Sequence, residues 1–121
     1  MYSLPTALWV ARNIHRRRLV AIILTQTMPE GVPLELLDAV AEEMGVHADP
    51  PVGLIVHTHY EEDGRVRIVD VWESAESHQK FVEERLGPAM AKVAAQRGID
   101  MAQAGQPESS VTEAHFVVRG R

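Results

Sequence analysis

The feature that most constrains this chain is a pair of strand-like segments joined by a short acidic turn. Residues 52–60 and 65–73 are rich in Val and Ile, and residues 61–64 between them read Glu-Glu-Asp-Gly. Two β-rich runs with a glycine in the joint predict an antiparallel hairpin, with Gly64 in a backbone conformation of positive φ. A two-stranded hairpin is not stable alone, so the rest of the chain must supply further strands or a covering layer.

A four-residue joint gives this hairpin an expected register. The register matters because a slip of one residue would move every side chain to the other face. It places Asp70 diagonally across from His57, at a Cβ separation of about 7–8 Å in a regular sheet. The expected pairs are Tyr60–Arg65, His57–Ile68, Val56–Val69 and Leu54–Val71.

The remaining chain alternates between strand-like and helix-like segments. Strands are indicated by Val, Ile and Thr content, and helices by apolar spacing between a Pro or Ser start and a Gly stop. The order is therefore βαββαβ, which predicts an α+β, ferredoxin-like fold with a four-stranded antiparallel sheet. The segments outside the hairpin are a strand at Leu19–Met28, a helix from Pro33 to Gly45, a helix from Ser74 that Gly87-Pro88 breaks or kinks and Gly98 ends, and a strand at Val111–Val118.

In this order the helices cover only one face of the sheet, and the other face needs a cover of its own. That face is expected to be too apolar to remain exposed, so a second copy of the chain is the natural partner and a homodimer is expected. The residues expected on the uncovered face are Ile23, Thr25, Thr27, Ile55, Ile68, Trp72 and Val117.

Length and composition exclude several classes of protein. A chain of 121 residues fits one ordinary domain, which we place at residues 19–121 after a basic arm, residues 1–18, that carries four arginines and no acidic residue. The net charge of −5 and only six aromatic residues argue against a nucleic-acid surface. No stretch approaches the ~20 apolar residues of a membrane span. The absence of cysteine excludes a disulfide scaffold and suits a cytoplasmic location.

The end of the second hairpin strand carries a resemblance to a known family. Residues 69–74, Val-Asp-Val-Trp-Glu-Ser, followed by a helix that contains Phe81, resemble the antibiotic-biosynthesis-monooxygenase-like domains of the dimeric α/β barrel superfamily. In that family the third strand ends in an aromatic-acidic-Ser step into the second helix. The resemblance implies a homodimer and a cofactor-independent monooxygenase acting on hydrophobic aromatic or polyketide-like molecules. The superfamily also contains proteins without known activity, so a non-catalytic, ligand-binding or structural dimer is the alternative.

The ionisable residues near Trp72 are the candidate catalytic groups. His57 and His59 lie two apart on one strand, so their rings point the same way, and Asp70 is expected to hold one imidazole in a chosen tautomer. A neutral histidine could then remove a proton from an acidic phenol or a 1,3-dicarbonyl, with Trp72 as a stacking wall. The further residues expected to bind substrate are Thr25, Thr27 and His115.

Two other types of site were weighed and set aside. His57 and His59 with a carboxylate would suit a divalent transition metal, but no spacing fixes a third ligand, and we expect no metal. The haem-degrading members of the resembling family carry an axial histidine well beyond the strand-three tryptophan. Here His78 follows Trp72 by six residues, and Thr25 or Thr27 stands where an asparagine is expected. We therefore expect no cofactor.

Overall fold

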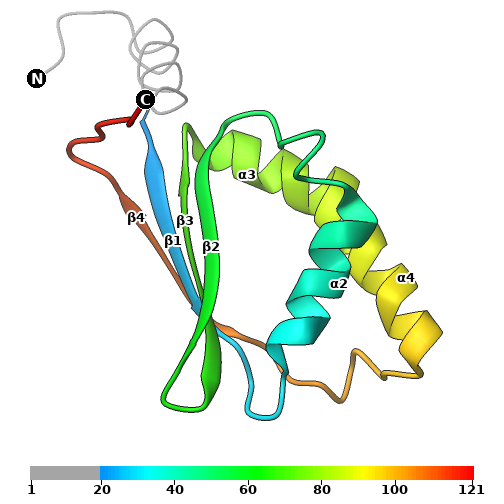
Figure 1. Cartoon of the computed structure of the whole chain (residues 1–121). Coiled ribbons are helices and arrows are strands. Elements are labelled where there is room, and N and C mark those ends of the chain that lie inside the picture. Colours follow the sequence, from blue (N-terminus) through cyan, green and yellow to red (C-terminus); the bar gives the residue numbers. More distant parts are fainter. Residues whose placement is uncertain (1–19) are drawn as a thin grey trace, which may run out of the picture.

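The computed structural model describes residues 20–121, so the basic arm of residues 1–18 lies outside the described part of the chain. Residues 20–121 form a four-stranded antiparallel sheet with helices packed on one of its faces (Figure 1). The order βαββαβ is confirmed, with the second helix divided by one π-helical turn, and the strands follow the order β2-β3-β1-β4 across the sheet. The elements are β1 (Ile22–Thr27), α2 (Leu34–Met44), β2 (Leu54–Glu62), β3 (Arg65–Trp72), α3 (Ala75–Phe81), the π-helical turn η1 (Val82–Leu86), α4 (Gly87–Arg97) and β4 (Glu108–Glu113).

The hairpin of β2 and β3 forms with a shorter loop than the sequence analysis expected. Glu62 pairs with Arg65, so only Asp63 and Gly64 turn the chain, with φ of 54° and 74°. Two central residues with positive φ match the right-handed twist of the flanking strands, which is why Asp-Gly is a preferred pair for such turns. The expected pairing of Tyr60 with Arg65 is therefore wrong by two residues. A shift of two keeps every side chain on its face.

A β-bulge at the start of β2 also departs from the expected register. Leu54 lies opposite Trp72 and Val56 lies opposite Val71, so β2 has one residue, Ile55, more than β3 at this point. The expected pair Leu54–Val71 is therefore wrong. An extra residue on one strand bends that strand and resets which side chains face the helices.

The assignment of Trp72 and Ile68 to the uncovered face is also wrong. Directly opposed residues of an antiparallel pair share a face, and Trp72 lies opposite Ile22, which is buried. The Trp72 ring packs against His78 and Phe81 of α3, with centroid separations of 5.3 and 5.1 Å. Ile68 lies four residues before Trp72 on the same strand and therefore shares the helix-covered face.

The other face of the sheet is not covered by any element among residues 20–121, as Figure 1 shows. By strand alternation Ile23, Thr25 and Thr27 lie on this open face, as the sequence analysis expected. Val56 and Tyr60 of β2 are on the same face and are 45% and 39% exposed. Large apolar side chains therefore remain in contact with solvent in the single chain.

The helix ends follow the local signals in the sequence. Gly45 ends α2 with φ 67°, and Gly98 ends α4 with φ 68°, both in the left-handed conformation that glycine adopts most easily. Ser74 caps α3, because its Oγ accepts a hydrogen bond from the backbone N–H of Ser77 at 3.1 Å. The expected positions of these helix boundaries are confirmed.

The Gly87-Pro88 step neither ends the second helix nor leaves it regular. Proline has no N–H to donate to the preceding turn, and its ring crowds the carbonyl four residues earlier. The chain accommodates this with η1, directly before α4, so three helical elements follow one another without a loop. Arg85 of η1 donates to the carbonyl of Met44 at 2.8 Å, which ties this turn to the end of α2.

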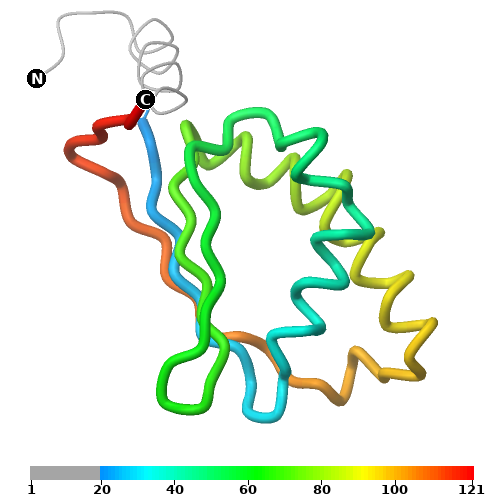
Figure 2. Tube along the Cα trace, in the orientation of Figure 1, coloured from blue at the N-terminus to red at the C-terminus, as the bar shows by residue number. Residues whose placement is uncertain are grey.

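The strands at the two ends of the chain are displaced from their expected positions. The first begins at Ile22 rather than Leu19, and the last is Glu108–Glu113 rather than Val111–Val118. Pairing with β1 determines the last strand, from Thr27 opposite Glu108 to Ile22 opposite Glu113. Figure 2 shows the preceding segment crossing from the end of α4 back to the sheet. All six residues of this edge strand are exposed, so it needs no apolar alternation, and the apolar pattern at residues 111–118 did not mark it.

The core between sheet and helices is small for a chain of this length. Helix α2 contains no buried residue, so its packing on the sheet is loose. No helix among residues 20–121 is long and apolar enough to cross a membrane. The buried apolar residues are Ile22, Leu24, Val66, Trp72, Ala89, Val93 and Ala94.

Candidate functional site

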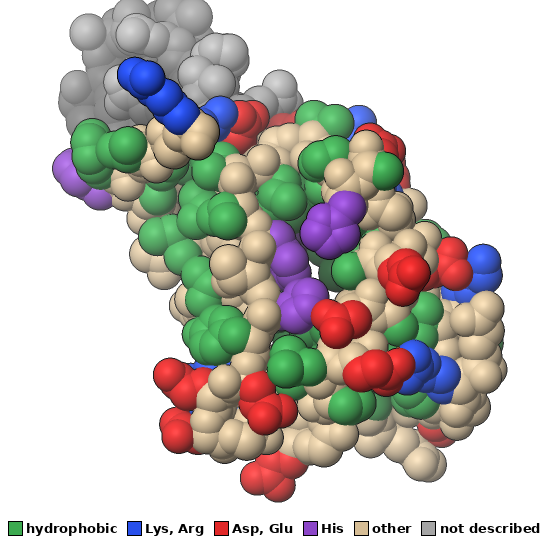
Figure 3. Space-filling view, in the orientation of Figure 1, with side chains coloured by type: hydrophobic (Ala, Val, Ile, Leu, Met, Phe, Trp, Pro, Cys, Tyr) green, Lys and Arg blue, Asp and Glu red, His purple; other side chains and the backbone are tan. Residues whose placement is uncertain are grey.

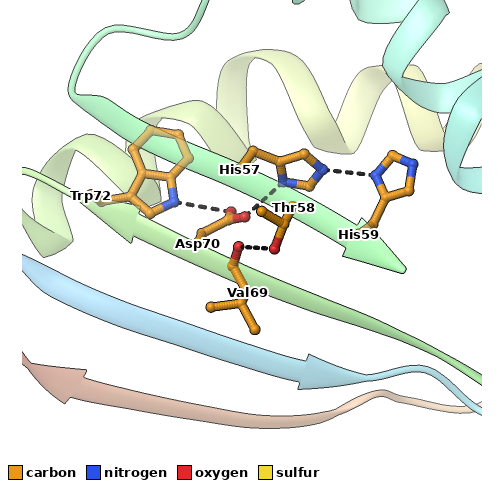
Figure 4. Close-up of polar contacts among 6 residues, drawn as sticks. All are labelled: His57, Thr58, His59, Val69, Asp70 and Trp72. Carbon is orange, nitrogen blue, oxygen red and sulfur yellow. Dashed lines mark hydrogen bonds and ion pairs between the residues drawn. The ribbon is translucent and has the colours of Figure 1, made fainter. Parts of the chain in front are cut away.

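A row of hydrogen-bonded polar side chains lies on the helix-covered face of β2 and β3. Figure 4 shows Trp72, Asp70, His57 and His59 following one another along this row. The two-residue turn places His57 directly opposite Asp70, closer than the diagonal placement expected from the sequence. The two histidines lie on the same side of β2 because they are two residues apart on a strand.

Asp70 is the buried anchor of this row. Its side chain is 7% exposed, and each carboxylate oxygen has a partner. Oδ1 lies 2.6 Å from Nδ1 of His57, and Oδ2 accepts a hydrogen bond from Nε1 of Trp72 at 3.1 Å. A buried carboxylate is tolerated when hydrogen bonds replace the water it has lost. Asp70 therefore holds the His57 ring in one orientation.

The two imidazoles contact each other and then leave the core. Nε2 of His57 lies 2.8 Å from Nδ1 of His59, and the ring centroids are 5.1 Å apart in an edge-on arrangement. Nε2 of His59 lies 2.8 Å from Oδ1 of Asp38. The row thus runs from the buried Trp72 to Asp38, whose side chain is 68% exposed.

Asp38 is the member of this row that the sequence analysis did not identify. It lies on α2, separated from His59 by 21 positions in the chain. Its contact depends on how α2 lies across β2, and no spacing in the sequence gives that arrangement. The only local signal is an acidic residue within the apolar stripe of α2, between Leu37 and Val40.

The tryptophan is part of the core rather than an exposed wall. Trp72 is 1% exposed, since His78, Phe81 and Asp70 surround it. Burial lowers the pKa of His78, and the negative charge of nearby Asp70 opposes that effect. His78 is an aromatic neighbour of the indole. The role the structure gives Trp72 is to donate to Asp70, not to present a free face for stacking.

The histidines are reached from a hollow between β2 and the helices. Figure 3 shows purple histidine side chains gathered at this hollow, with acidic side chains beside them. The His57 side chain is 37% exposed and that of His59 is 18% exposed. We call this space the histidine hollow.

Three residues expected to bind substrate lie elsewhere. Thr25 and Thr27 are on the open face of the sheet, because their neighbours Leu24 and Ile22 occupy the covered face. His115 lies beyond the end of β4 and is exposed. The expected grouping of these three with His57 is therefore wrong.

A second concavity lies at the edge of the sheet where α3 begins. It is a pocket of about 390 Å³ lined by both polar and apolar side chains, and it contains none of the residues of the histidine row. Its charged members, Glu73 and Arg119, pair with each other at 2.7 Å. We place the chemistry at the histidine hollow instead, because acid–base groups converge there. The pocket residues are Ala21, Ile55, Glu73, Ser74, Ser77, Val117 and Arg119.

Solved structures of antibiotic biosynthesis monooxygenases are similar in fold to this chain. A candidate antibiotic biosynthesis monooxygenase from Chloroflexus aurantiacus is 18% identical with a TM-score of 0.53, and the match covers 81% of this chain and 96% of that one. SnoaB, a cofactor-independent oxygenase from Streptomyces nogalater, is 17% identical with a TM-score of 0.53, covering 82% and 96%. The chain has the fold of the antibiotic biosynthesis monooxygenases. The expected resemblance to that family is confirmed at the level of the fold.

A third solved structure adds a ligand to the comparison. MhuD is 26% identical with a TM-score of 0.50, covering 84% of this chain and 99% of that one, and its structure holds two manganese protoporphyrin IX molecules per active site. No sequence profile of a known family matches this chain. No curated protein sequence matches it closely enough to count as a relative.

The residues described here do not fit a porphyrin or a metal ion. The helix histidine beside the site, His78, packs its ring against Trp72 with the centroids 5.3 Å apart, so it is a packing residue rather than a free ligand for a porphyrin. Among residues 20–121, no group of three or more His, Asp or Glu side chains is placed to hold a metal ion. We derive no chemistry through either group.

Proposed function

We propose that this protein is a cofactor-independent monooxygenase that acts on a hydrophobic, aromatic or polyketide-like small molecule. The observation that carries the proposal is the buried Asp70 carboxylate bound to Nδ1 of His57. A carboxylate at Nδ1 fixes the imidazole tautomer and leaves Nε2 as the nitrogen that can accept a proton. His57 and His59 line the histidine hollow, where a substrate could reach them.

In the proposed reaction, Nε2 of His57 removes a proton from an acidic carbon or hydroxyl group of the substrate. The electron pair left on the substrate then reduces O₂. For a substrate methylene group, the carbon loses two hydrogens and gains one oxygen atom as a carbonyl, and the other oxygen atom leaves as water. General base catalysis of this kind contributes about 10²–10⁴-fold to a rate. The fold of SnoaB, a cofactor-independent oxygenase, supports this reaction type.

The alternative is a non-catalytic dimer that binds a ligand or none. One observation favours it: all four ring nitrogens of His57 and His59 already have partners within the protein. Buried polar groups that satisfy one another can serve the fold alone. In the enzymatic reading, substrate must take the place of one of these contacts.

Oxygen consumption with a model substrate separates the two functions. Anthrone is an aromatic ketone with an acidic methylene group, and its oxidation to anthraquinone can be followed with an oxygen electrode and by absorbance. We expect the wild-type protein to accelerate this reaction and His57→Ala to lose at least about tenfold of the acceleration. His47→Ala, in the exposed loop after α2, is the matched control and should retain it. Equal rates for wild type and His57→Ala would contradict the proposal.

We also propose that two copies pair through the open face of the sheet. The exposed Val56 and Tyr60, with Ile23, Val69 and Val71 beside them on the same face, support this pairing. Contiguous apolar surface of this kind is uncommon on a protein that remains monomeric.

Light scattering tests the pairing directly. The wild-type protein should have the mass of a dimer at micromolar concentration, whereas Val56→Asp should be monomeric, because a buried unpaired carboxylate opposes association. Glu61→Ala, on the other face of the same strand, is a control that should leave the dimer intact. A monomeric wild-type protein would rule out the pairing.

A further inference from the structure

The starting observation is that the paired histidines lie between two carboxylates. Asp70 contacts the outer nitrogen of His57, Nδ1, and Asp38 contacts the outer nitrogen of His59, Nε2. The inner nitrogens, Nε2 of His57 and Nδ1 of His59, face each other at 2.8 Å. Every ring nitrogen in the pair is therefore at hydrogen-bond distance from one partner.

Counting protons fixes the charge of this arrangement. An ionised carboxylate only accepts hydrogen bonds, so both outer nitrogens must carry a proton. The inner contact needs one more proton, because two bare nitrogens at 2.8 Å would repel each other. With both carboxylates ionised, all three contacts are made together only when the two imidazoles hold three protons and the pair bears one positive charge. A neutral pair would leave one of the three contacts without its proton.

Two acidic side chains flank the imidazole pair, Asp70 from β3 and Asp38 from α2. Asp70 is buried beside His57, and its other carboxylate oxygen accepts a hydrogen bond from Nε1–H of Trp72. Asp38 contributes a second negative charge from α2. His78 packs against Trp72 from α3, and burial lowers its pKa while the charge of Asp70 opposes that effect. Two negatively charged carboxylates would thus flank an imidazole pair that holds one proton more than a neutral pair.

We infer that the inner nitrogens form a clamp for the oxygen of an acidic enol or phenol, an inference that rests on the proposed function. The hydroxyl replaces the direct contact between the inner nitrogens; because 2.8 Å leaves no room for an oxygen between them, the His59 ring turns away from His57 as the hydroxyl enters. Its O–H gives its proton to Nε2 of His57, and Nδ1–H of His59 donates to the same oxygen. The O–H bond breaks, the N–H bond forms, and the electron pair stays on the substrate as an oxyanion held by two imidazolium rings.

This clamp assigns separate tasks to the two histidines. His57 is the base, oriented by Asp70, and His59 is the cationic donor that stabilises the developing negative charge. Asp38 does not touch the substrate; it is a positioning residue that keeps a proton on the outer nitrogen of His59. The substrate class is narrowed to molecules with an acidic hydroxyl or enol oxygen rather than those with an acidic carbon alone.

The variant Asp38→Asn tests the proton count. Unlike a carboxylate, the asparagine amide can donate to Nε2 of His59. His59 can then carry its single proton on Nδ1, and all three contacts are satisfied by two protons. Nitrogen-15 NMR of the imidazole rings at neutral pH should show three ring protons on the wild-type pair and two on the variant. Asp49→Asn removes the same charge from an exposed loop position and should still show three.

Binding of para-nitrophenol, an acidic phenol whose anion absorbs visible light, tests the clamp. The wild-type protein should bind the anion about tenfold more tightly than Asp38→Asn, because a hydrogen bond from a charged donor is stronger than one from a neutral donor. Asp49→Asn should bind it as the wild-type protein does. Equal binding by the wild-type protein and Asp38→Asn would overturn the clamp.

The proton measurement has its own contradicting outcomes. Two ring protons on the wild-type pair would refute the charged state. Ring signals that change when a chelator is added would mean that a metal ion, not a proton, joins the inner nitrogens, and would equally refute it. Neither measurement requires turnover, so the clamp can stand when anthrone oxidation fails, and anthrone oxidation can succeed when the clamp fails.

Discussion

The two faces of the sheet differ in polarity, and the difference is the reverse of the usual one. The face covered by helices carries a carboxylate and two histidines in its centre, at Asp70, His57 and His59. The uncovered face carries mainly Val, Ile and Thr, with Val56 and Tyr60 exposed. An antiparallel sheet with one wet face normally places its polar residues outside and its apolar residues inside.

The difference supports the proposed roles of the two faces, a reactive site on one and an interface on the other. Polar side chains beneath the helices are tolerated where they form hydrogen bonds with one another, as the row from Trp72 to Asp38 does. On the open face the polar contacts among the described residues are local, such as the Thr58 hydroxyl to the carbonyl of Val69 at 2.8 Å and Arg67 to Glu62 at 3.5 Å. The first pattern fits a reactive site and the second fits an interface.

The largest expected effect is a difference in the free energy of unfolding between two substitutions at neighbouring residues of β3, whose side chains point to opposite faces. Trp72→Ala should lower the free energy of unfolding by roughly 3–5 kcal/mol, because it empties core volume and removes a donor from Asp70. Val71→Ala, on the open face, should lower it by roughly 1 kcal/mol in the monomer. Urea denaturation at low protein concentration measures both. Similar losses for the two variants would mean that the faces are not as different as described.

The contact between the sheet and α3 can be broken at its tightest point. Gly53 has φ of +83°, and a Cβ there would lie 2.5 Å from Cβ and Oγ of Ser77. Gly53→Ala should therefore cost about 2–4 kcal/mol through backbone strain and overlap together. Gly64→Ala, with φ of +74° but no atom within 4 Å of the new Cβ, isolates the strain and should cost about 1 kcal/mol. Thermal unfolding of both variants checks the difference, and equal costs would argue against the close contact.

The smallest effect concerns the pH dependence contributed by the covered face. Burial lowers the pKa of His78, so the unfolded chain binds a proton at a higher pH than the folded chain does. Stability should therefore fall as the pH drops through about 6.5, the ordinary histidine value, and the fall should end below the folded pKa. His78→Phe keeps an aromatic ring beside Trp72 and should remove this part of the slope. Urea denaturation at several pH values measures it; His47→Gln should leave the slope unchanged, and an unchanged slope in His78→Phe would contradict the assignment.

The parts of the fold that were predictable are those determined by neighbouring residues. Gly45 and Gly98 end helices because of their own backbone freedom, and Ser74 caps α3 through the next turn. The hairpin followed from its β-rich strands, but its loop length did not, because Glu61 and Glu62 continue the strand and only Asp63-Gly64 turns the chain. The Asp-Gly pair was the available signal for the shorter loop.

The parts that could not be predicted depend on how distant elements pack. Which face of the sheet carries the helices decides whether Trp72 is core or surface, and strand alternation alone does not contain that information. The pairing of His57 with Asp70 was expected only as a diagonal neighbour, and Asp38 was not expected at all, because it comes from α2. The position of β4 follows from its pairing with β1 rather than from its own polar sequence.

The bulge at Ile55 has a consequence for how relatives of this chain should be compared. Gly53, before the bulge, touches α3, and His57 and His59 come after it. The extra residue at the bulge shifts the alternation of the strand by one position between Gly53 and the two histidines. A homologue lacking one residue here could retain the whole fold yet carry its histidine pair on the open face of the sheet, or move its glycine away from α3. Gaps of two residues elsewhere in β2 would leave both intact. An alignment gap of odd length in this strand is therefore a better sign of lost chemistry than the substitution of any single side chain around the hollow.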